Sequence, residues 1–154
     1  VRMVLLRIVE DDAFVFFTNY GSKKAKEAFL TNKVAFNIHW KSLRRQIRVR
    51  GHVEKEDGVI ADQYFSSREI GSQAAAWASK QSETLTDRQE LIERWQSYQN
   101  EYKGKFVRPG FWGGIRIKPI QIEFWADGQY RLHDRFLWER ALGGKGWSTR
   151  RLYP

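Results

Sequence analysis

The stretch "PGFWGGIRIKPIQIEFWADGQYRLHDRFLWER", residues 109–140, decides the fold class of this 154-residue chain. Its first part, residues 109–128, is rich in the β-branched and aromatic side chains that strands favour. Asp127-Gly128 is a strong short-range signal for a hairpin turn. Residues 129–140 are therefore predicted to return antiparallel to the strand before the turn.

The return strand carries an unusual row of cations within "YRLHDRF", residues 130–136. Successive side chains of a strand point to opposite faces. Arg131, His133 and Arg135 would then share one face of the sheet. Clustered cations need an anion when they are sheltered from water, so this face is a candidate binding surface.

The rest of the chain repeats the same strand chemistry around a helical middle. Further strands are predicted at residues 2–9, 13–19, 34–40, 44–55 and 147–153. Helical patterns cover residues 21–32, residues 57–82 as two short helices broken near Gly71, and a helix after Thr86. Ser22 is predicted to cap the first helix, and Thr86 opens a capping box with Gln89.

The order of these elements indicates one mainly β domain over residues 1–154 with flanking helices. About seven strands are expected, with three or four helices. Most strands follow one another directly, without the strand–helix alternation of a doubly wound parallel sheet. We therefore expect an antiparallel β-barrel, either closed or split, with helices packed outside it.

Composition narrows the classes of function. The 27 Lys and Arg residues exceed the 18 Asp and Glu residues, which gives a net charge of +9 and indicates an anionic partner. Nucleic acid, a membrane surface and a phosphorylated small molecule are the alternatives. No apolar run reaches the roughly 20 residues of a membrane span. The chain has no cysteine, and His39 and His52 are isolated, so no metal site is expected.

Two further groups of residues suit phosphate. Lys23 and Lys24 stand at a predicted helix start, where free backbone N–H groups attract anions. Tyr64, Arg68 and Ser72 are spaced i, i+4 and i+8, which places three hydrogen-bond donors on one face of a helix. Taken alone, either group is more often an ordinary solvated surface.

Eight short motifs, in order along nearly the whole chain, resemble pyridoxamine/pyridoxine 5′-phosphate oxidases. The motifs are "RMVLL", "FFTNYGSKKAKE", "RRQIRVRG", "QYFSSREIGSQAAAWASKQS", "WGG", "IEFW", "RLHDR" and "RRLYP". The resemblance implies an FMN-binding split barrel that forms a homodimer. It also implies oxidation of pyridoxine or pyridoxamine 5′-phosphate to pyridoxal 5′-phosphate, with a hydride passing to FMN and O2 reoxidising the flavin to give H2O2. A cytoplasmic location is expected.

The resemblance also assigns residues by motif. The implied FMN contacts are Arg2, Met3, Val4, Leu5, Phe17, Thr18, Lys23, Lys24, Gln46, Gln81, Ser82, Trp125 and Arg135. The implied substrate contacts are Arg7, Tyr64, Arg68 and Ser72 around the phosphate, with Arg131 and His133, the implied catalytic pair, over the pyridine ring. In this reading the protein supplies orientation and electrostatics, and the flavin supplies the redox chemistry.

The chain departs from the family pattern in three places. Position 7 is usually Lys and is Arg here, and position 23 is usually Arg and is Lys here. Each exchange keeps the charge but changes the geometry of the hydrogen bonds. The family's N-terminal segment is expected to be missing from this sequence.

Two alternatives remain beside the oxidase. A related FMN-dependent oxidase of the same fold could act on another substrate, such as a phenazine precursor. A nucleic-acid-binding barrel would also combine positive charge with aromatic side chains, and it would bind single strands with a steep salt dependence. The oxidase interpretation expects small phosphorylated B6 vitamers and O2 as partners, and no nucleic acid or membrane.

Overall fold

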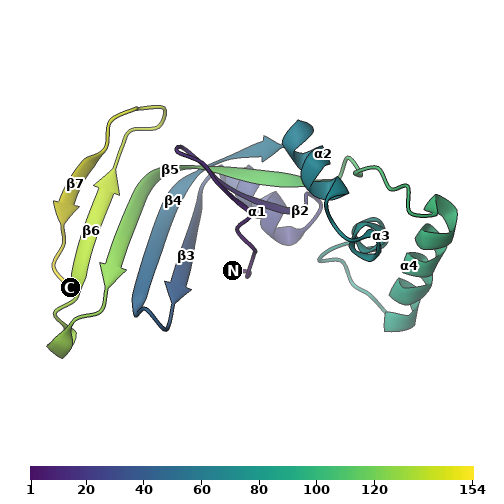
Figure 1. Cartoon of the computed structure of the whole chain (residues 1–154), viewed down its shortest axis with the longest axis horizontal. Coiled ribbons are helices and arrows are strands. Elements are labelled where there is room, and N and C mark those ends of the chain that lie inside the picture. Colours follow the sequence, from purple (N-terminus) through teal and green to yellow (C-terminus); the bar gives the residue numbers. More distant parts are fainter.

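The computed structural model describes all 154 residues as seven strands and four α-helices with one short 3₁₀ helix (Figure 1). The strands are β1 (Ile8–Val9), β2 (Phe14–Asn19), β3 (Val34–Trp40), β4 (Arg45–Glu56), β5 (Trp112–Ala126), β6 (Asp134–Glu139) and β7 (Ser148–Arg151). The helices are α1 (Lys23–Thr31), α2 (Val59–Ser66), α3 (Ile70–Ala78), α4 (Arg88–Tyr102) and the 3₁₀ helix η1 (Gln129–Arg131). This agrees with the predicted class and with the predicted number of elements.

All seven strands belong to one antiparallel sheet that branches at β5. The sheet runs in the order β1-β2-β5-β4-β3, while β6 also pairs with β5 and β7 pairs with β6. Along one edge, β5 pairs with β4 for most of its length. Along the other edge, residues 112–117 pair with β2 and residues 121–126 pair with β6. Pro119 lies between these two pairings, where the missing N–H of proline costs no ladder hydrogen bond.

The branch lets β5 bend, so its two halves face different parts of the molecule (Figure 1). At the bend, β4 shifts register between Arg50 and Gly51, and Gly51 lies against the backbone of Lys118. A Cβ on Gly51 would stand 2.3 Å from the Lys118 carbonyl oxygen, which no side chain tolerates. Glycine is required here because the two backbones approach so closely.

Two apolar clusters hold the helices on this sheet. Helix α1 contributes Ala25 and Ala28 to a cluster with Val53, Ile115 and Ile117 of β4 and β5. The second cluster gathers around α2, α3 and the start of β5, and its buried members are Phe65, Ala74, Phe106 and Trp112. Trp95, Tyr98 and Tyr102 of α4 pack against it. Helices α2, α3 and α4 therefore gather at the end of the molecule away from β6 and β7 (Figure 1).

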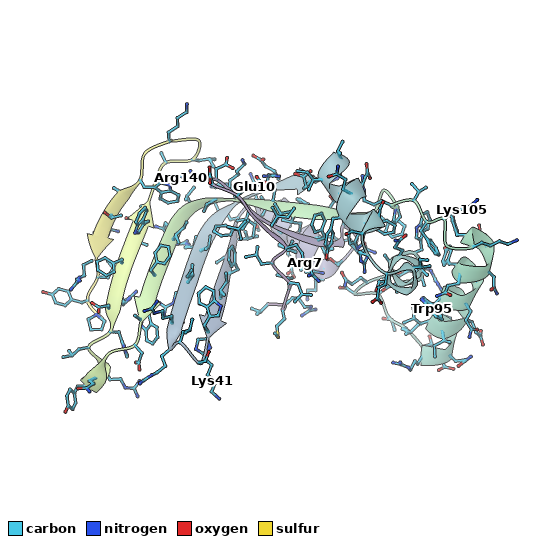
Figure 2. The ribbon with its side chains drawn as sticks, viewed as in Figure 1. Arg7, Glu10, Lys41, Trp95, Lys105 and Arg140 are labelled. Atoms are coloured by element: carbon cyan, nitrogen blue, oxygen red, sulfur yellow. The ribbon has the colours of Figure 1, made fainter.

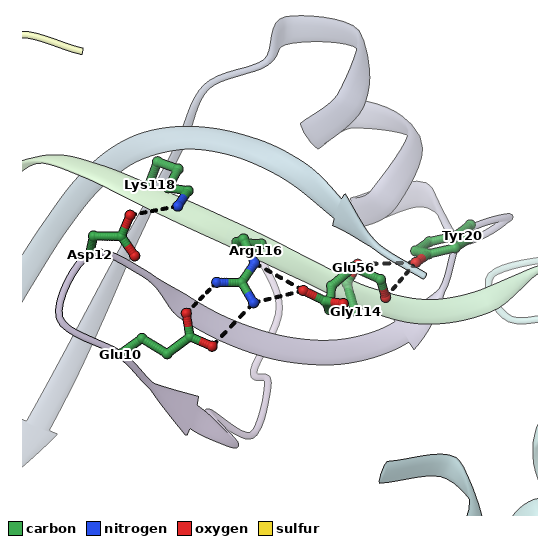
Figure 3. Close-up of polar contacts among 7 residues, drawn as sticks. All are labelled: Glu10, Asp12, Tyr20, Glu56, Gly114, Arg116 and Lys118. Carbon is green, nitrogen blue, oxygen red and sulfur yellow. Dashed lines mark hydrogen bonds and ion pairs between the residues drawn. The ribbon is translucent and has the colours of Figure 1, made fainter. Parts of the chain in front are cut away.

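A cluster of charged groups ties the β1–β2 hairpin to β4 and β5 (Figure 3). Arg116 of β5 binds both carboxylate oxygens of Glu10 and donates two further hydrogen bonds to Glu56, at 2.7 and 3.0 Å. The hydroxyl of Tyr20 donates toward the carbonyls of Glu56 and Gly114, and burial raises the pKa of Tyr20 to about 12. The cluster joins the end of the N-terminal segment to the strand that leads into α2.

The predicted extent of the first strand is wrong. In residues 2–9 only Ile8 and Val9 form a strand, because the chain before Arg7 leaves the edge of β2. The two short helices predicted within residues 57–82 are confirmed as α2 and α3, and the break between them, at residues 67–69, lies just before Gly71. Gly71 itself is in α3, where its carbonyl accepts a hydrogen bond from the Trp95 indole.

The predicted helix caps also differ from the observed ones. Asp87, and not Thr86, caps α4, because its carboxylate accepts a hydrogen bond from the Gln89 backbone N–H. Ser22 does occupy the N-cap position of α1, but its hydroxyl makes no capping hydrogen bond. The hydroxyl instead donates to the Asn19 carbonyl at 2.7 Å.

The predicted cationic strand face is also wrong. β6 begins only at Asp134, and residues 127–133 form the connection from β5 instead of a tight Asp127-Gly128 turn. Tyr130 and Arg131 have φ values of 55° and 67°, in the left-handed region that ends strand geometry. Arg131, His133 and Arg135 therefore do not alternate along one strand.

Candidate functional site

A cavity of about 790 Å³ lies where the N-terminal segment passes between β2 and the helices. This volume is within the range of sites for small organic ligands. Arg7, on the segment that crosses the cavity, lies between the sheet and the helical end of the molecule (Figure 2). The cavity brings together thirteen of the residues assigned by motif: Arg2, Met3, Val4, Leu5, Arg7, Phe17, Thr18, Lys24, Tyr64, Arg68, Ser72, Gln81 and Ser82.

Four cations line this cavity in two pairs. Arg2 and Lys24 form one pair, and burial together with the charge of Arg2 lowers the pKa of Lys24. Arg7 and Arg68 form the other, and burial together with the charge of Arg7 lowers the pKa of Arg68. None of the four makes an ion pair with a carboxylate. Each pair therefore lacks a counter-charge that an anionic ligand could supply.

Aromatic faces hold the second pair of cations in place of carboxylates. The guanidinium carbon of Arg68 lies 4.9 Å from the ring centroid of Trp112, and that of Arg7 lies 5.7 Å from the ring of Tyr64. Contacts of this kind orient a guanidinium through its planar face. Stacking on a ring leaves the N–H donors of the guanidinium free. Nη1 of Arg68 is buried and has no hydrogen-bond partner. A buried donor of this kind is what an anion binding in the cavity would satisfy.

Tyr64, Arg68 and Ser72 reach the cavity by a route that differs from the prediction. Tyr64 lies on α2, Arg68 on the turn after it and Ser72 on α3, so the three do not share the face of one helix. The change of direction at residues 67–69 nevertheless places all three on the same cavity wall. The three residues therefore line one cavity, although they do not share a helix face.

A polar network lies beside the first pair of cations. The ammonium group of Lys24 donates to Oε1 of Gln81 at 2.7 Å, and the hydroxyl of Thr18 donates to the same oxygen at 3.1 Å. Thr18 is buried on β2, and Ser82 follows in the left-handed region with a φ of 76°. The network fixes the segment after α3 against β2, with Oε1 of Gln81 as the shared acceptor.

The sequence did not assign several other residues that line the cavity. They are Asn19, Ser67, Glu69, Ala75, Ala76, Ser79 and Trp112. Trp112 could have been assigned from the sequence, because it begins the "WGG" motif. Its ring stacks almost parallel to that of Phe17, with the ring centroids 5.6 Å apart. The small residues of α3 match no motif for binding, because they contribute only by leaving room in the cavity.

The remaining assigned residues lie outside this cavity. Lys23 is exposed and faces Glu27 at 3.9 Å. Gln46 and Trp125 line a second hollow of about 560 Å³ on the strands β3 to β6. The ring of His133 packs 4.7 Å from that of Trp125, and Arg131 is exposed on η1. The chain alone therefore places the assigned residues in two separate groups.

Arg135 and His133 are held by carboxylates near the second hollow. Arg135 donates to both carboxylate oxygens of Glu123, at 2.8 and 3.1 Å, and to the Tyr153 carbonyl at 2.9 Å. Nδ1 of His133 lies 3.1 Å from a carboxylate oxygen of Asp127 and 3.2 Å from the Gly128 backbone nitrogen, so it can donate to the first or accept from the second, but not both at once. Both side chains are thus oriented before any ligand binds.

The Glu123 carboxylate gives a prediction for stability against pH. The hydrogen bonds from Arg135 lower its pKa below the ordinary 4.5, against an opposing effect of burial. A depressed carboxyl pKa stabilises the fold above the unfolded value, and the contribution is lost as the pH falls through the folded value. The melting temperature should fall from pH 5 to pH 3, and Glu123→Gln should make that fall less steep in circular dichroism melts. Equal slopes for Glu123→Gln, the parent and an exposed control, Glu101→Gln, would contradict the assignment.

No helix in this structure combines the length and the apolar composition that a membrane crossing requires. No three or more His, Cys, Asp or Glu side chains are grouped so that they could ligate a metal ion.

Comparisons with known proteins show the family of this chain. Residues 1–99 match the family described as pyridoxamine 5′-phosphate oxidase, and residues 112–154 match the pyridoxine 5′-phosphate oxidase C-terminal dimerisation region. The chain is 55% identical over its full length to a pyridoxine/pyridoxamine 5′-phosphate oxidase of Cereibacter sphaeroides, covering 77% of that protein. It is 56% identical to the one from Roseobacter denitrificans, over 99% of the chain and 76% of the relative.

Solved structures show the same fold. The crystal structure of PhzG from Burkholderia lata, in complex with tetrahydrophenazine-1-carboxylic acid, matches 99% of this chain and 74% of its own with a TM-score of 0.91 and 28% identity. A pyridoxamine 5′-phosphate oxidase-related, FMN binding protein of Nostoc punctiforme matches 99% and 80% with a TM-score of 0.71 and 13% identity. The fold is the FMN-binding split barrel, and this chain belongs to the pyridoxine/pyridoxamine 5′-phosphate oxidase family.

Proposed function

We propose that this protein oxidises pyridoxine or pyridoxamine 5′-phosphate to pyridoxal 5′-phosphate with FMN as cofactor. The observation that carries the proposal is the presence of two cation pairs, each without a carboxylate partner, in one cavity. The cofactor and the substrate each bring one phosphate. Two anionic ligands side by side would supply both missing counter-charges.

The residues present fit FMN at the Arg2–Lys24 end of the cavity. Lys24 is partly desolvated there and already bound to Gln81, so a phosphate would meet a fixed cation. Thr18 and Ser82 add hydroxyl groups to the same wall. When bound, FMN would supply the redox chemistry, accepting a hydride from the substrate C4′ and passing electrons to O2 to give H2O2.

The substrate phosphate fits the Arg7–Arg68 end. The unpartnered Nη1 of Arg68 and the guanidinium of Arg7 would bind its oxygens. The hydroxyls of Tyr64 and Ser72 on the same wall can donate further hydrogen bonds. These contacts would fix the substrate ring relative to the cofactor, which is the contribution expected from positioning in catalysis.

A homodimer would bring the two groups of assigned residues together. The matched dimerisation region, residues 112–154, contains Trp125, Arg131, His133 and Arg135. This region, made of β5, β6 and the connection between them, exposes large apolar side chains, including Phe124, Leu132 and Trp138. Obligate dimers commonly bury apolar surfaces of this kind in their interface. In the proposed dimer, the second hollow of one subunit faces the main cavity of its partner, and Arg131 and His133 contact the substrate ring.

The oxidase activity can be tested directly by following pyridoxal 5′-phosphate formation together with O2 consumption. The purified protein, supplied with FMN, should oxidise pyridoxine 5′-phosphate far faster than pyridoxine, which lacks the phosphate bound by Arg68. Equal rates with the two compounds, or no product from either phosphate, would refute the proposal.

The second candidate is oxidation of a phenazine precursor, and the likeness to PhzG favours it. The exchange at position 7, where Arg7 stands, also changes the substrate end of the cavity. A phenazine carboxylic acid carries no phosphate, so it would leave one cation pair without a phosphate. Competition between the two substrates for one preparation distinguishes the candidates by their kcat/KM values.

Arg135→Trp should weaken FMN binding by about tenfold or more. The substitution removes a fixed cation and leaves Glu123, whose carboxylate is mostly buried, with only Arg48 as a partner. Fluorescence titration of the apoprotein with FMN measures the dissociation constant. Arg151→Gln, an exposed arginine on β7, is the matched control and should bind FMN as the parent does. If Arg135→Trp retains parental affinity, Arg135 does not contribute to the cofactor site.

A further inference from the structure

Gln73 is a buried polar residue in the first turn of α3, and it does not line the cavity. Only 6% of its surface is exposed. Its side-chain amide nitrogen donates to the Arg68 carbonyl at 2.7 Å and lies 3.3 Å from the Ser66 carbonyl. A single buried amide thus binds the backbone on both sides of Ser67, in the turn that carries Arg68.

The turn between α2 and α3 needs such support. Carbonyl groups at the end of a helix lack partners within that helix. The start of α3 has no side-chain cap, since the N-cap residue Glu69 makes no capping hydrogen bond. The Gln73 amide supplies a donor to the carbonyls at the end of α2, and it does so from the first turn of α3. The two helices are thereby locked at the angle that the turn defines.

The position of this turn decides where the Arg68 guanidinium lies. Arg68 is held against the Trp112 ring, with its Nη1 buried and without a partner. Burial lowers the pKa of Arg68, so the guanidinium is held in the cavity at an energetic cost. A turn free to relax would let this side chain move toward water and away from the cavity.

We propose that Gln73 is a positioning residue, which holds the α2–α3 turn so that Arg68 meets the substrate phosphate. The inference rests on the proposed function, and it assigns no contact between Gln73 and substrate. Loss of the amide donor should therefore weaken phosphate binding at the Arg7–Arg68 end. The Arg2–Lys24 end, which other elements build, should keep its affinity for FMN.

The test replaces Gln73 by methionine, which keeps the length of the side chain and removes the donor. The KM for pyridoxine 5′-phosphate should rise about tenfold, the change expected if displacement of Arg68 costs the substrate phosphate about one hydrogen bond. The kcat should stay within twofold of the parent, and FMN content should not change. Calorimetric titration of the FMN-loaded protein with inorganic phosphate should show a similar loss of affinity.

Trp95→Phe is the matched control. The Trp95 indole, on α4 (Figure 2), donates to the Gly71 carbonyl of α3 at 2.9 Å, so the variant also removes one hydrogen bond to this helix. It should lower the melting temperature and leave the KM within twofold of the parent. Equal increases of KM in Gln73→Met and Trp95→Phe would show a general effect of α3 stability and would overturn the proposal. An unchanged KM in Gln73→Met would also overturn it.

Two further comparisons keep the test decisive. If Gln73→Met does not fold, Gln73→Asn retains the amide but withdraws it by one methylene group. The Asn variant should raise the KM more than twofold, and a smaller change would overturn the proposal. If the parent does not oxidise pyridoxine 5′-phosphate, the proposed function fails, and the phosphate titration alone decides the role of Gln73.

Discussion

Replacing Arg68 by methionine should raise the KM for pyridoxine 5′-phosphate at least 100-fold and leave FMN bound. The Arg68 guanidinium offers the phosphate a buried donor that no other group uses. Each charge-assisted hydrogen bond contributes about 1.5–3 kcal/mol, and two of them correspond to a 100-fold change or more. Steady-state kinetics measure the KM, and the flavin absorbance of the purified variant measures cofactor content.

The same substitution should raise the melting temperature of the substrate-free protein by about 2 °C. Arg68 is partly buried beside Arg7 without a carboxylate partner, so its charge destabilises the free protein. Arg88→Met, at the exposed start of α4, is the control and should change neither property. A stable Arg68→Met variant with parental KM would exclude Arg68 from the substrate site.

Arg116→Met should lower the free energy of unfolding by about 3 kcal/mol, the scale observed when one partner of a buried ion pair is removed. The Arg116 side chain is 13% exposed and holds both Glu10 and Glu56. Without it, the mostly buried Glu56 carboxylate has no cation. The melting temperature should fall by about 6–12 °C, which calorimetry measures directly.

A double variant separates the lost pairing from lost packing. Adding Glu56→Gln to Arg116→Met removes the uncompensated carboxylate and should recover part of the stability. The two substitutions would then be non-additive, as expected for residues in one network. If each single variant costs less than 2 °C, the cluster in Figure 3 does not stabilise the fold.

The sequence was most informative where side-chain alternation and turn residues agreed. It identified β2, β3 and the antiparallel pairing of β5 with residues near 134–139. It failed at Tyr130 and Arg131, because nothing in their composition indicates a left-handed backbone. It placed the helix break near Gly71, because glycine is the usual signal for an interruption, and the observed break at residues 67–69 lies just before this residue. Gly71 itself lies in the first turn of α3, and its carbonyl accepts a hydrogen bond from the Trp95 indole.

The candidate site could also be predicted only in part from the sequence. Charge and spacing pointed to Arg68 and its neighbours, but not to the aromatic rings that hold them. The support from Gln73 was also invisible, because an amide that binds backbone carbonyls follows no side-chain periodicity. The separation between the main cavity and the hollow around Trp125 depends on long-range folding and on assembly with a partner. Local sequence patterns carry no information about either.

The proposal that two phosphate-bearing molecules lie together in this protein is tested most directly by one anaerobic titration. Pyridoxine 5′-phosphate is added to the FMN-loaded protein without oxygen, and the flavin absorbance is recorded. We expect the yellow absorbance to bleach at about one substrate per flavin, and to return when air is admitted. A flavin spectrum that does not change with excess pyridoxine 5′-phosphate would contradict the account.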